Sequence, residues 1–228
     1  MGKIMNLNIF NSQNEEIAAI INELTLVINK LLKTHSVITI AVSGGKSPIH
    51  LFDKLSNTDL PWDKINITLV DERIVDTLSE DSNEHLVKKH LLKNKAKNAK
   101  FIGLVDNLLD IEGMLLRNQI NTPSIDIAIL GMGEDGHTAS IFPDCKELEQ
   151  AVDLKNESSY INTNPITAKY SRISLTLNSL IKIPYIFFSI NGELKLKVFK
   201  EAARGNNQNY PISYLLKSRS DAKTFWYI

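Results

Sequence analysis

The chain has 228 residues, of which 43% are hydrophobic, and its 26 basic side chains balance 26 acidic ones. A net charge of zero gives no overall attraction for nucleic acid or for an anionic membrane, so any anion site must be local. The single cysteine, Cys145, excludes an internal disulfide and fits a reducing compartment, and no run of about 20 apolar residues predicts a membrane span. We therefore expect one cytoplasmic α/β domain over residues 1–228, a monomer or weak homodimer that binds neither nucleic acid nor membrane.

Predicted strands and helices alternate along the chain. Strands are expected at 1–10, 37–43, 65–73, 125–137, 184–190 and 223–228. In the strands at 65–73 and 125–137, the polar residues gather at the carboxyl end. Helices are expected at 14–32, after Pro48, at 83–93, 105–119 and 192–203, and after Pro211. The segment 155–169, rich in asparagine, serine and threonine, predicts no clear element. Strands that are apolar throughout are typical of a doubly wound, mostly parallel, Rossmann-like sheet with helices on both faces.

Ligands of such sheets bind beyond the carboxyl ends of the strands, and a first polar cluster, SGGKSP at 43–48, lies there. Gly44 and Gly45 let the backbone approach a ligand closely, and the amides that follow can hold phosphate oxygens. The hydroxyls of Ser43 and Ser47 can add hydrogen bonds. A plain strand-to-helix turn would need the same glycines and proline, so the cluster alone does not distinguish the two. Its spacing is not that of a Walker loop, which gives nucleotide binding no support.

A second cluster, Asp71-Glu72-Arg73, ends the strand expected at 65–73. Arginine offers a planar fork that binds phosphate through two hydrogen bonds, and a neighbouring carboxylate can hold that fork in place. Three adjacent charges are equally typical of a solvated loop.

The third cluster, GMGEDGHTAS at 131–140, is the most informative. Its glycines, Gly133 among them, permit a tight loop, and His137 stands where a new helix should begin. An imidazole has an ordinary pKa of about 6.5, which suits proton transfer near neutrality, so His137 is the best candidate for a general base. His85 and His90 are five residues apart, a spacing that does not place both on one helical face, so we expect no metal site. We also expect no cofactor.

Two further cations can complete an anion site. Arg172 and Lys195 each follow an expected chain reversal and can point toward the strand ends, although isolated surface cations usually face solvent.

Five motifs in this order carry a family resemblance: SGGKSP, DERIVD with Asn83 after it, GMGEDGHTASIFP, SRISL and NGELK. Across nearly the whole chain they resemble the 6-phosphogluconolactonases of the pentose phosphate pathway. The third motif is the most specific, since it follows the family pattern GxGxDGHxASLFP with Ile141 in place of leucine. The first differs from the usual SGGSTP or SGGTTP at Lys46 and Ser47, and Ser174 replaces a threonine of the family's RITLT.

Glucosamine-6-phosphate deaminases share the fold, the glycine-rich first turn and the GxGxDGH loop. They follow the histidine with a segment ending in Asn-Glu-Pro, where this chain has Ile141-Phe142-Pro143-Asp144, and they carry Asp-Glu-Tyr where this chain has Arg73 as third residue. Both differences favour the lactonase.

The resemblance implies hydrolysis of 6-phospho-D-glucono-1,5-lactone, a sugar phosphate, with His137 as the base. Asp135 can orient the imidazole or shape the loop, and the amides of Gly44 and Gly45 can hold either an oxyanion or the phosphate. The implied substrate-binding residues are Ser43, Gly44, Gly45, Ser47, Asp71, Arg73, Gly133, Arg172 and Lys195. A deaminase-like isomerase and a non-catalytic sugar-phosphate binding module remain as alternatives.

Overall fold

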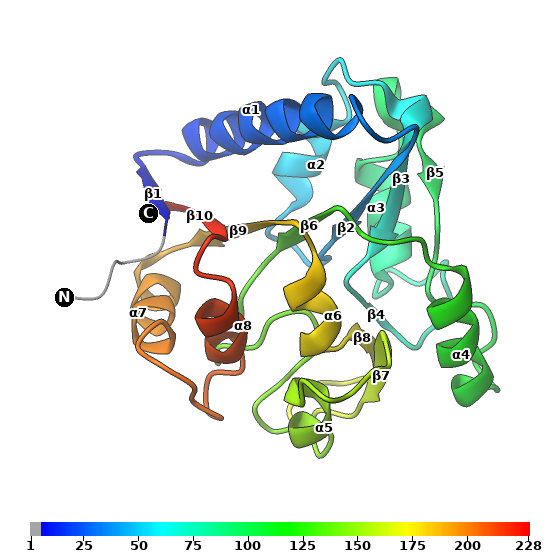
Figure 1. Ribbon diagram of the computed structural model, residues 1–228, viewed down its shortest axis with the longest axis vertical. Helices are drawn as coiled ribbons and strands as arrows, with labels where there is room; N and C mark the ends of the chain where they lie inside the picture. The colour runs from blue at the N-terminus through cyan, green and yellow to red at the C-terminus, as the bar shows by residue number, and fades with distance from the viewer. Residues whose placement is uncertain (1–5) are drawn as a thin grey trace.

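A computed structural model describes residues 6–228, and its centre is a seven-stranded parallel sheet in the order β1-β10-β9-β6-β2-β3-β5 (Figure 1). The strands are β1 (Leu7–Phe10), β2 (Ile38–Val42), β3 (Ile65–Leu69), β5 (Lys100–Phe101), β6 (Ile127–Leu130), β9 (Tyr185–Asn191) and β10 (Lys223–Tyr227). Every residue of β2 and of β6 is buried, as expected for central strands covered on both faces. The predicted doubly wound sheet is confirmed.

Helices cover both faces of this sheet, and Figure 1 shows α1 on one side with α6, α7 and α8 on the other. The helices are α1 (Gln13–Leu31), α2 (Ile49–Leu55), α3 (Asn83–His90), α4 (Ile111–Asn121), α5 (Leu148–Val152), α6 (Leu177–Lys182), α7 (Glu193–Ala202) and α8 (Ile212–Ser218). Two short 3-10 helices, η1 (Trp62–Lys64) and η2 (Asn94–Asn98), complete the set in the described residues. None of the helices in residues 6–228 is both long and apolar enough to cross a membrane.

The boundaries of the helices follow from local chemistry. Helix α1 begins after Ser12, whose side chain accepts a hydrogen bond from the main-chain N–H of Glu15 at 3.3 Å. Its apolar stripe is buried, and each fully buried side chain such as Leu24 contributes roughly 1.5–3 kcal/mol. The helix expected from residue 105 begins only at Ile111, because Asp110 caps it through the N–H of Gly113. The part of the first predicted strand at 1–5 lies outside the described residues.

A second, three-stranded antiparallel sheet was not expected. Its order is β4 (Asp71–Arg73), β8 (Arg172–Leu175) and β7 (Tyr160–Thr163). The prediction that 65–73 is one strand is therefore wrong at its end, since β3 stops at Leu69 and the chain turns to pair with β8. The segment 155–169 supplies β7, which the sequence did not indicate.

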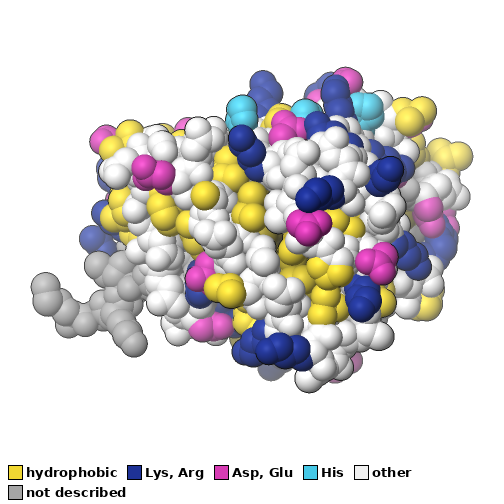
Figure 2. Space-filling model, turned by 90° about the horizontal axis from the view of Figure 1, so that it is seen from above, with side chains coloured by type: hydrophobic (Ala, Val, Ile, Leu, Met, Phe, Trp, Pro, Cys, Tyr) yellow, Lys and Arg dark blue, Asp and Glu magenta, His cyan; other side chains and the backbone are white. Residues whose placement is uncertain are grey.

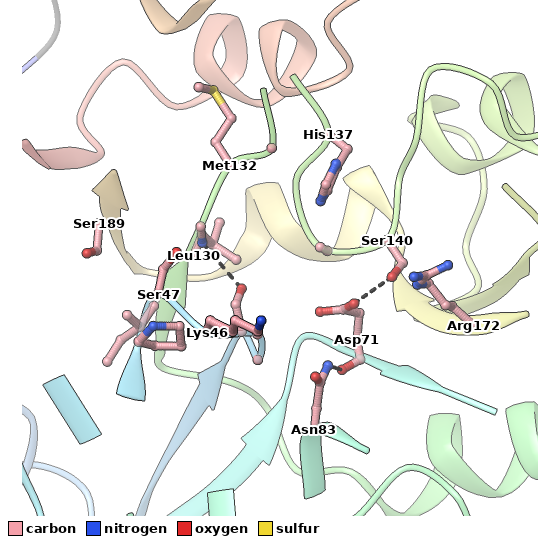
Figure 3. A pocket seen from close by; sticks show the side chains of 18 of the residues that line it. Lys46, Ser47, Asp71, Asn83, Leu130, Met132, His137, Ser140, Arg172 and Ser189 are labelled. Carbon is pink, nitrogen blue, oxygen red and sulfur yellow. Dashed lines mark hydrogen bonds between the residues drawn. The ribbon is translucent and has the colours of Figure 1, made fainter. Parts of the chain in front are cut away.

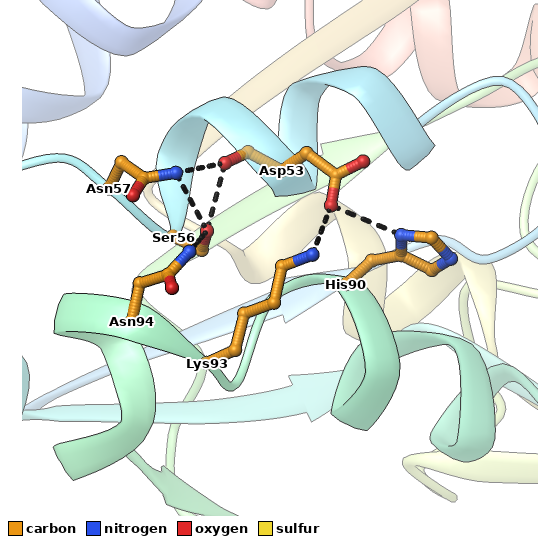
Figure 4. A network of polar contacts seen from close by, with 6 residues as sticks. All are labelled: Asp53, Ser56, Asn57, His90, Lys93 and Asn94. Atoms are coloured by element: carbon orange, nitrogen blue, oxygen red, sulfur yellow. Dashed lines mark hydrogen bonds and ion pairs between the residues drawn. The ribbon is translucent and has the colours of Figure 1, made fainter.

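Figure 4 shows a polar network that joins α2 to the end of α3. The carboxylate of Asp53 accepts a hydrogen bond from Lys93 Nζ at 2.6 Å and lies 3.1 Å from His90 Nδ1. The hydroxyl of Ser56 accepts a hydrogen bond from Asn94 Nδ2 at 3.0 Å. His90 thus contacts the Asp53 carboxylate within this network.

The sheet grows on both sides of β2. Strands β3 and β5 follow β2 in the chain and lie on one side of it, whereas the later strands β6, β9 and β10 lie on the other side. The gap between the carboxyl ends of β2 and β6 is therefore a topological switch point, where doubly wound sheets bind their ligands. Figure 2 shows basic and acidic side chains interspersed over the face on the α1 side, which agrees with the zero net charge of the chain.

Candidate active site

A pocket lies at this switch point, where the loops after β2, β6 and β9 meet the small sheet (Figure 3). Asp135 does not line it but contacts His137, which does. The predicted residues that line the pocket are Ser43, Gly44, Gly45, Ser47, Asp71, Arg73, Gly133, His137, Arg172 and Lys195. The structure thus brings together side chains that are more than 150 residues apart in the sequence.

The glycine loop after β2 is tied to the loop after β6. The N–H of Ser43 donates to Ile129 O at 2.9 Å, and the Ser43 hydroxyl accepts a hydrogen bond from the N–H of Gly131 at 3.4 Å. Gly45 adopts a φ of +87°, a conformation that side chains with a Cβ rarely adopt. These contacts leave the Ser43 hydroxyl proton free to donate toward the pocket.

Asn83 packs directly beneath the glycine loop. Its Nδ2 donates to Asp71 O at 2.9 Å, its side chain is buried, and its Oδ1 has no hydrogen-bond partner in the described residues. A Cβ placed on Gly44 would lie 1.9 Å from that Oδ1, so any larger residue at position 44 would force the Asn83 side chain or the loop to shift. No role for Asn83 follows from the sequence alone, because its contacts are with residues far away in the chain.

His137 is held by Asp135 in the loop after β6. The carboxylate of Asp135 lies 2.6 Å from His137 Nδ1 and accepts a second hydrogen bond from the His137 N–H at 3.1 Å. Burial alone would raise the pKa of Asp135, but the hydrogen bonds and charge of His137 outweigh it and leave that pKa below its usual value. Gly133 makes room for the pair, since a Cβ there would lie 2.2 Å from Nδ1. The imidazole also stacks on Phe142 with 4.0 Å between ring centroids.

Asp71 and Glu72 point in opposite directions because successive residues of a strand alternate between its faces. Asp71 faces the pocket, where its carboxylate accepts a hydrogen bond from the Ser140 hydroxyl at 2.5 Å. Glu72 instead caps helix α3, and its buried carboxylate accepts hydrogen bonds from the N–H groups of Asn83 and Glu84 at 2.8 and 2.7 Å. Burial raises the pKa of Glu72 against these hydrogen bonds. The charged triplet therefore combines a pocket residue with a structural one.

Arg73 and Arg172 stand directly opposite each other in the β4–β8 pair and so share the face that lines the pocket. Main-chain carbonyls hold both: Arg73 Nη1 donates to Asp81 O at 2.6 Å, and Arg172 Nη1 donates to Tyr170 O at 2.9 Å. The arginine–carboxylate ion pairs within residues 6–228 are formed by Arg117 and Arg219, so main-chain carbonyls, rather than a neighbouring carboxylate, hold the Arg73 and Arg172 guanidinium groups. Burial lowers the pKa of Arg172, and the charge of Arg73 adds to the effect.

Lys195 enters the pocket from the first turn of α7, on the side of the His137 loop. Burial lowers its pKa, while the charges of Glu134 and Asp135 act in the opposite sense. Ser189 of β9 also lines the pocket, and its hydroxyl donates to the buried Glu16 of α1 at 2.5 Å. The sequence alone did not identify Ser189 or Glu16 as residues of the site, because Ser189 lies in an ordinary strand pattern and Glu16 in an ordinary helix pattern.

Comparisons with known proteins identify the family of the chain. The family model described as glucosamine-6-phosphate isomerases/6-phosphogluconolactonase matches residues 11–226. The chain is 42% identical to a 6-phosphogluconolactonase of Neisseria meningitidis over 182 residues, 78% of this chain and 79% of the relative. It is 40% identical to a 6-phosphogluconolactonase of Helicobacter pylori over 203 residues, 87% of each chain.

A solved structure supports the same relationship. The crystal structure of a 6-phosphogluconolactonase from Shewanella baltica superposes with a TM-score of 0.92 at 31% identity and covers 100% of both chains. The resemblance expected from the five motifs is thereby confirmed. The chain belongs to the glucosamine-6-phosphate isomerase/6-phosphogluconolactonase family.

Proposed function

We propose that the chain hydrolyses 6-phospho-D-glucono-1,5-lactone to 6-phospho-D-gluconate. The observation that carries the proposal is the His137–Asp135 pair, which opens into a pocket that also contains two opposed arginines. A base and an anion anchor in one pocket are what hydrolysis of a phosphorylated lactone requires. The names of the relatives support lactone hydrolysis rather than deamination.

The proton chemistry follows from the orientation of the imidazole. Because Asp135 accepts a hydrogen bond at Nδ1, that nitrogen carries the proton and Nε2 is left free to accept one. His137 Nε2 takes a proton from water as the water oxygen bonds to the lactone carbonyl carbon and the carbonyl becomes an oxyanion. The oxyanion then collapses, the bond from that carbon to the ring oxygen breaks, and the imidazolium returns its proton to the ring oxygen.

The phosphate anchor rests on the cations of the pocket. Arg73 and Arg172 present two forks on one face of the small sheet, and their mutual repulsion is relieved when a phosphate dianion lies between them. Lys195 lies near Glu134 and Asp135, so it supplies positive charge to a part of the pocket away from the two arginines. The hydroxyls of Ser43 and Ser47 and the amides of Gly44 and Gly45 add donors for the phosphate or for the oxyanion.

A purified sample tests the proposal through lactone hydrolysis measured above the spontaneous rate. The His137→Asn variant should lose roughly 10²- to 10⁴-fold in kcat while its Kd for 6-phosphogluconate stays within a few fold of the wild-type value. Wild-type turnover in this variant would refute the role of His137 as base. Ammonia release from glucosamine 6-phosphate would instead support the deaminase alternative, and binding of 6-phosphogluconate without hydrolysis would support a non-catalytic module.

A further inference from the structure

Four cationic side chains line the pocket, and one of them has no part in the proposed mechanism. Arg73 and Arg172 are held by main-chain carbonyls, and Lys195 is half-buried on α7. Lys46 is different, because it is exposed and lies on the glycine loop between Gly45 and Ser47. Figure 3 shows it between Ser47 and Asp71, below His137.

Lys46 also lacks the usual partner of a surface lysine. Several lysines of the chain pair with a carboxylate, among them Lys88 with Glu84 at 2.6 Å and Lys93 with Asp53 at 2.6 Å. Lys46 forms no such ion pair within residues 6–228, and the single carboxylate that lines the pocket, on Asp71, accepts its hydrogen bond from Ser140. Its ammonium group is therefore available to an anion from solvent.

We propose that Lys46 is a specificity-determining residue that captures the phosphate of the incoming substrate at the mouth of the pocket. This inference rests on the proposed function. Since the net charge is zero, no overall field draws a dianion toward the pocket, and the attraction must come from local charge. An exposed lysine on a glycine loop can meet the phosphate before the inner arginines do, so it acts on capture rather than on the chemical step.

The size of the effect expected on removing Lys46 follows from the exposure of its side chain. A solvent-exposed pair is weak and screened by salt, so the loss of Lys46 should lower kcat/KM for the phosphorylated lactone by about two- to fivefold at low ionic strength. The Debye length falls from about 30 Å at 0.01 M to about 3 Å at 1 M, so this deficit should shrink as salt is added. The change should appear in KM and not in kcat, because no reacting atom depends on Lys46.

Lys54 offers a matched control. It is an exposed lysine of α2, eight residues further along the chain, forms no ion pair within residues 6–228 and does not line the pocket. We would compare the Lys46→Thr, Lys46→Arg and Lys54→Thr variants with the wild type on 6-phosphogluconolactone and on plain gluconolactone, at low and at high salt. Melting curves of all four proteins would show that each is folded.

The inference predicts a deficit in Lys46→Thr that is confined to the phosphorylated lactone, shrinks with salt and is largely restored in Lys46→Arg. Equal deficits on both lactones, a deficit that salt does not change, or the same deficit in Lys54→Thr would overturn it. If the wild type hydrolyses the phosphorylated lactone and Lys46→Thr matches it, the inference alone fails. If the wild type hydrolyses neither lactone, the proposed function fails.

Discussion

Replacing Gly44 with alanine should disturb the pocket through one identifiable contact. The added Cβ would lie 1.9 Å from Asn83 Oδ1 and 2.2 Å from Asn83 Cγ, whereas ordinary contacts begin near 3.4 Å. The two groups must therefore separate by more than about 1 Å, and Asn83 cannot rotate away without losing its hydrogen bond to Asp71 O. Overpacking of this kind typically costs about 1–3 kcal/mol.

Gly45→Ala is the matched comparison. A Cβ at Gly45 would meet nothing within 4 Å, but its φ of +87° would strain an alanine by about 1–2 kcal/mol. The two variants should thus lose similar stability for different reasons, and only the first should be relieved by a smaller residue at position 83. We expect Asn83→Ser to recover at least about 1 kcal/mol in the Gly44→Ala background and nothing in the Gly45→Ala background.

Urea unfolding of the single and double variants measures this coupling, and kcat/KM on 6-phosphogluconolactone shows whether the loop recovers its position. Activity should fall in Gly44→Ala and return in part with Asn83→Ser. Strictly additive changes in the free energy of unfolding would refute the proposed contact. Equal relief of both glycine variants would show that Asn83→Ser acts on the whole loop instead.

Three other predictions follow from the site. Arg73→Ala should raise KM far more for the phosphorylated lactone than for gluconolactone, and Arg73→Lys should restore only part of the loss, because lysine lacks the fork; equal effects on both lactones would show that Arg73 does not contact the phosphate. Asp135→Asn should lower kcat by about 10²- to 10⁴-fold with little change in KM, since an amide can favour the wrong tautomer of His137, and a retained kcat would limit Asp135 to shaping the loop. Burial raises the pKa of Glu16 from 4.5 to about 7, so the folded state keeps a proton that the unfolded state loses, and stability should decline as pH rises from 4.5 to about 7. The free energy of unfolding should therefore fall by as much as about 3 kcal/mol between about pH 5 and about pH 8 in the wild type but not in Glu16→Gln. Equal declines in the two proteins would contradict the assignment.

The parallel sheet and the pocket loops could be predicted from the sequence because each depends on a local pattern. Apolar runs such as 37–43 mark buried strands, and the glycines that follow mark the turns at their carboxyl ends. His137 stood out for the same reason, since its loop carries an unusual density of glycine and acidic residues.

The small sheet could not be predicted in this way. Strand β4 has three residues, too few to show a period, and its partner β8 lies about 100 residues later in the chain. The burial of Glu72 and Asn83 depends on that pairing and on helix α3, so their surroundings are set by tertiary contacts that no short window contains.

The opposition of Arg73 and Arg172 has a consequence for how the molecule tolerates insertions and deletions. Their shared face depends on the register of β4 against β8, and moving either strand by one residue would turn its arginine to the opposite face. Loops around a pocket usually accept changes in length without harm. An extra residue inside the strand, between Arg172 and Ile173, would instead turn the Arg172 side chain away from the pocket if Ile173 to Leu175 kept their partners on β4. Binding of the phosphate therefore depends on the spacing within β8 as well as on the residues that line the pocket.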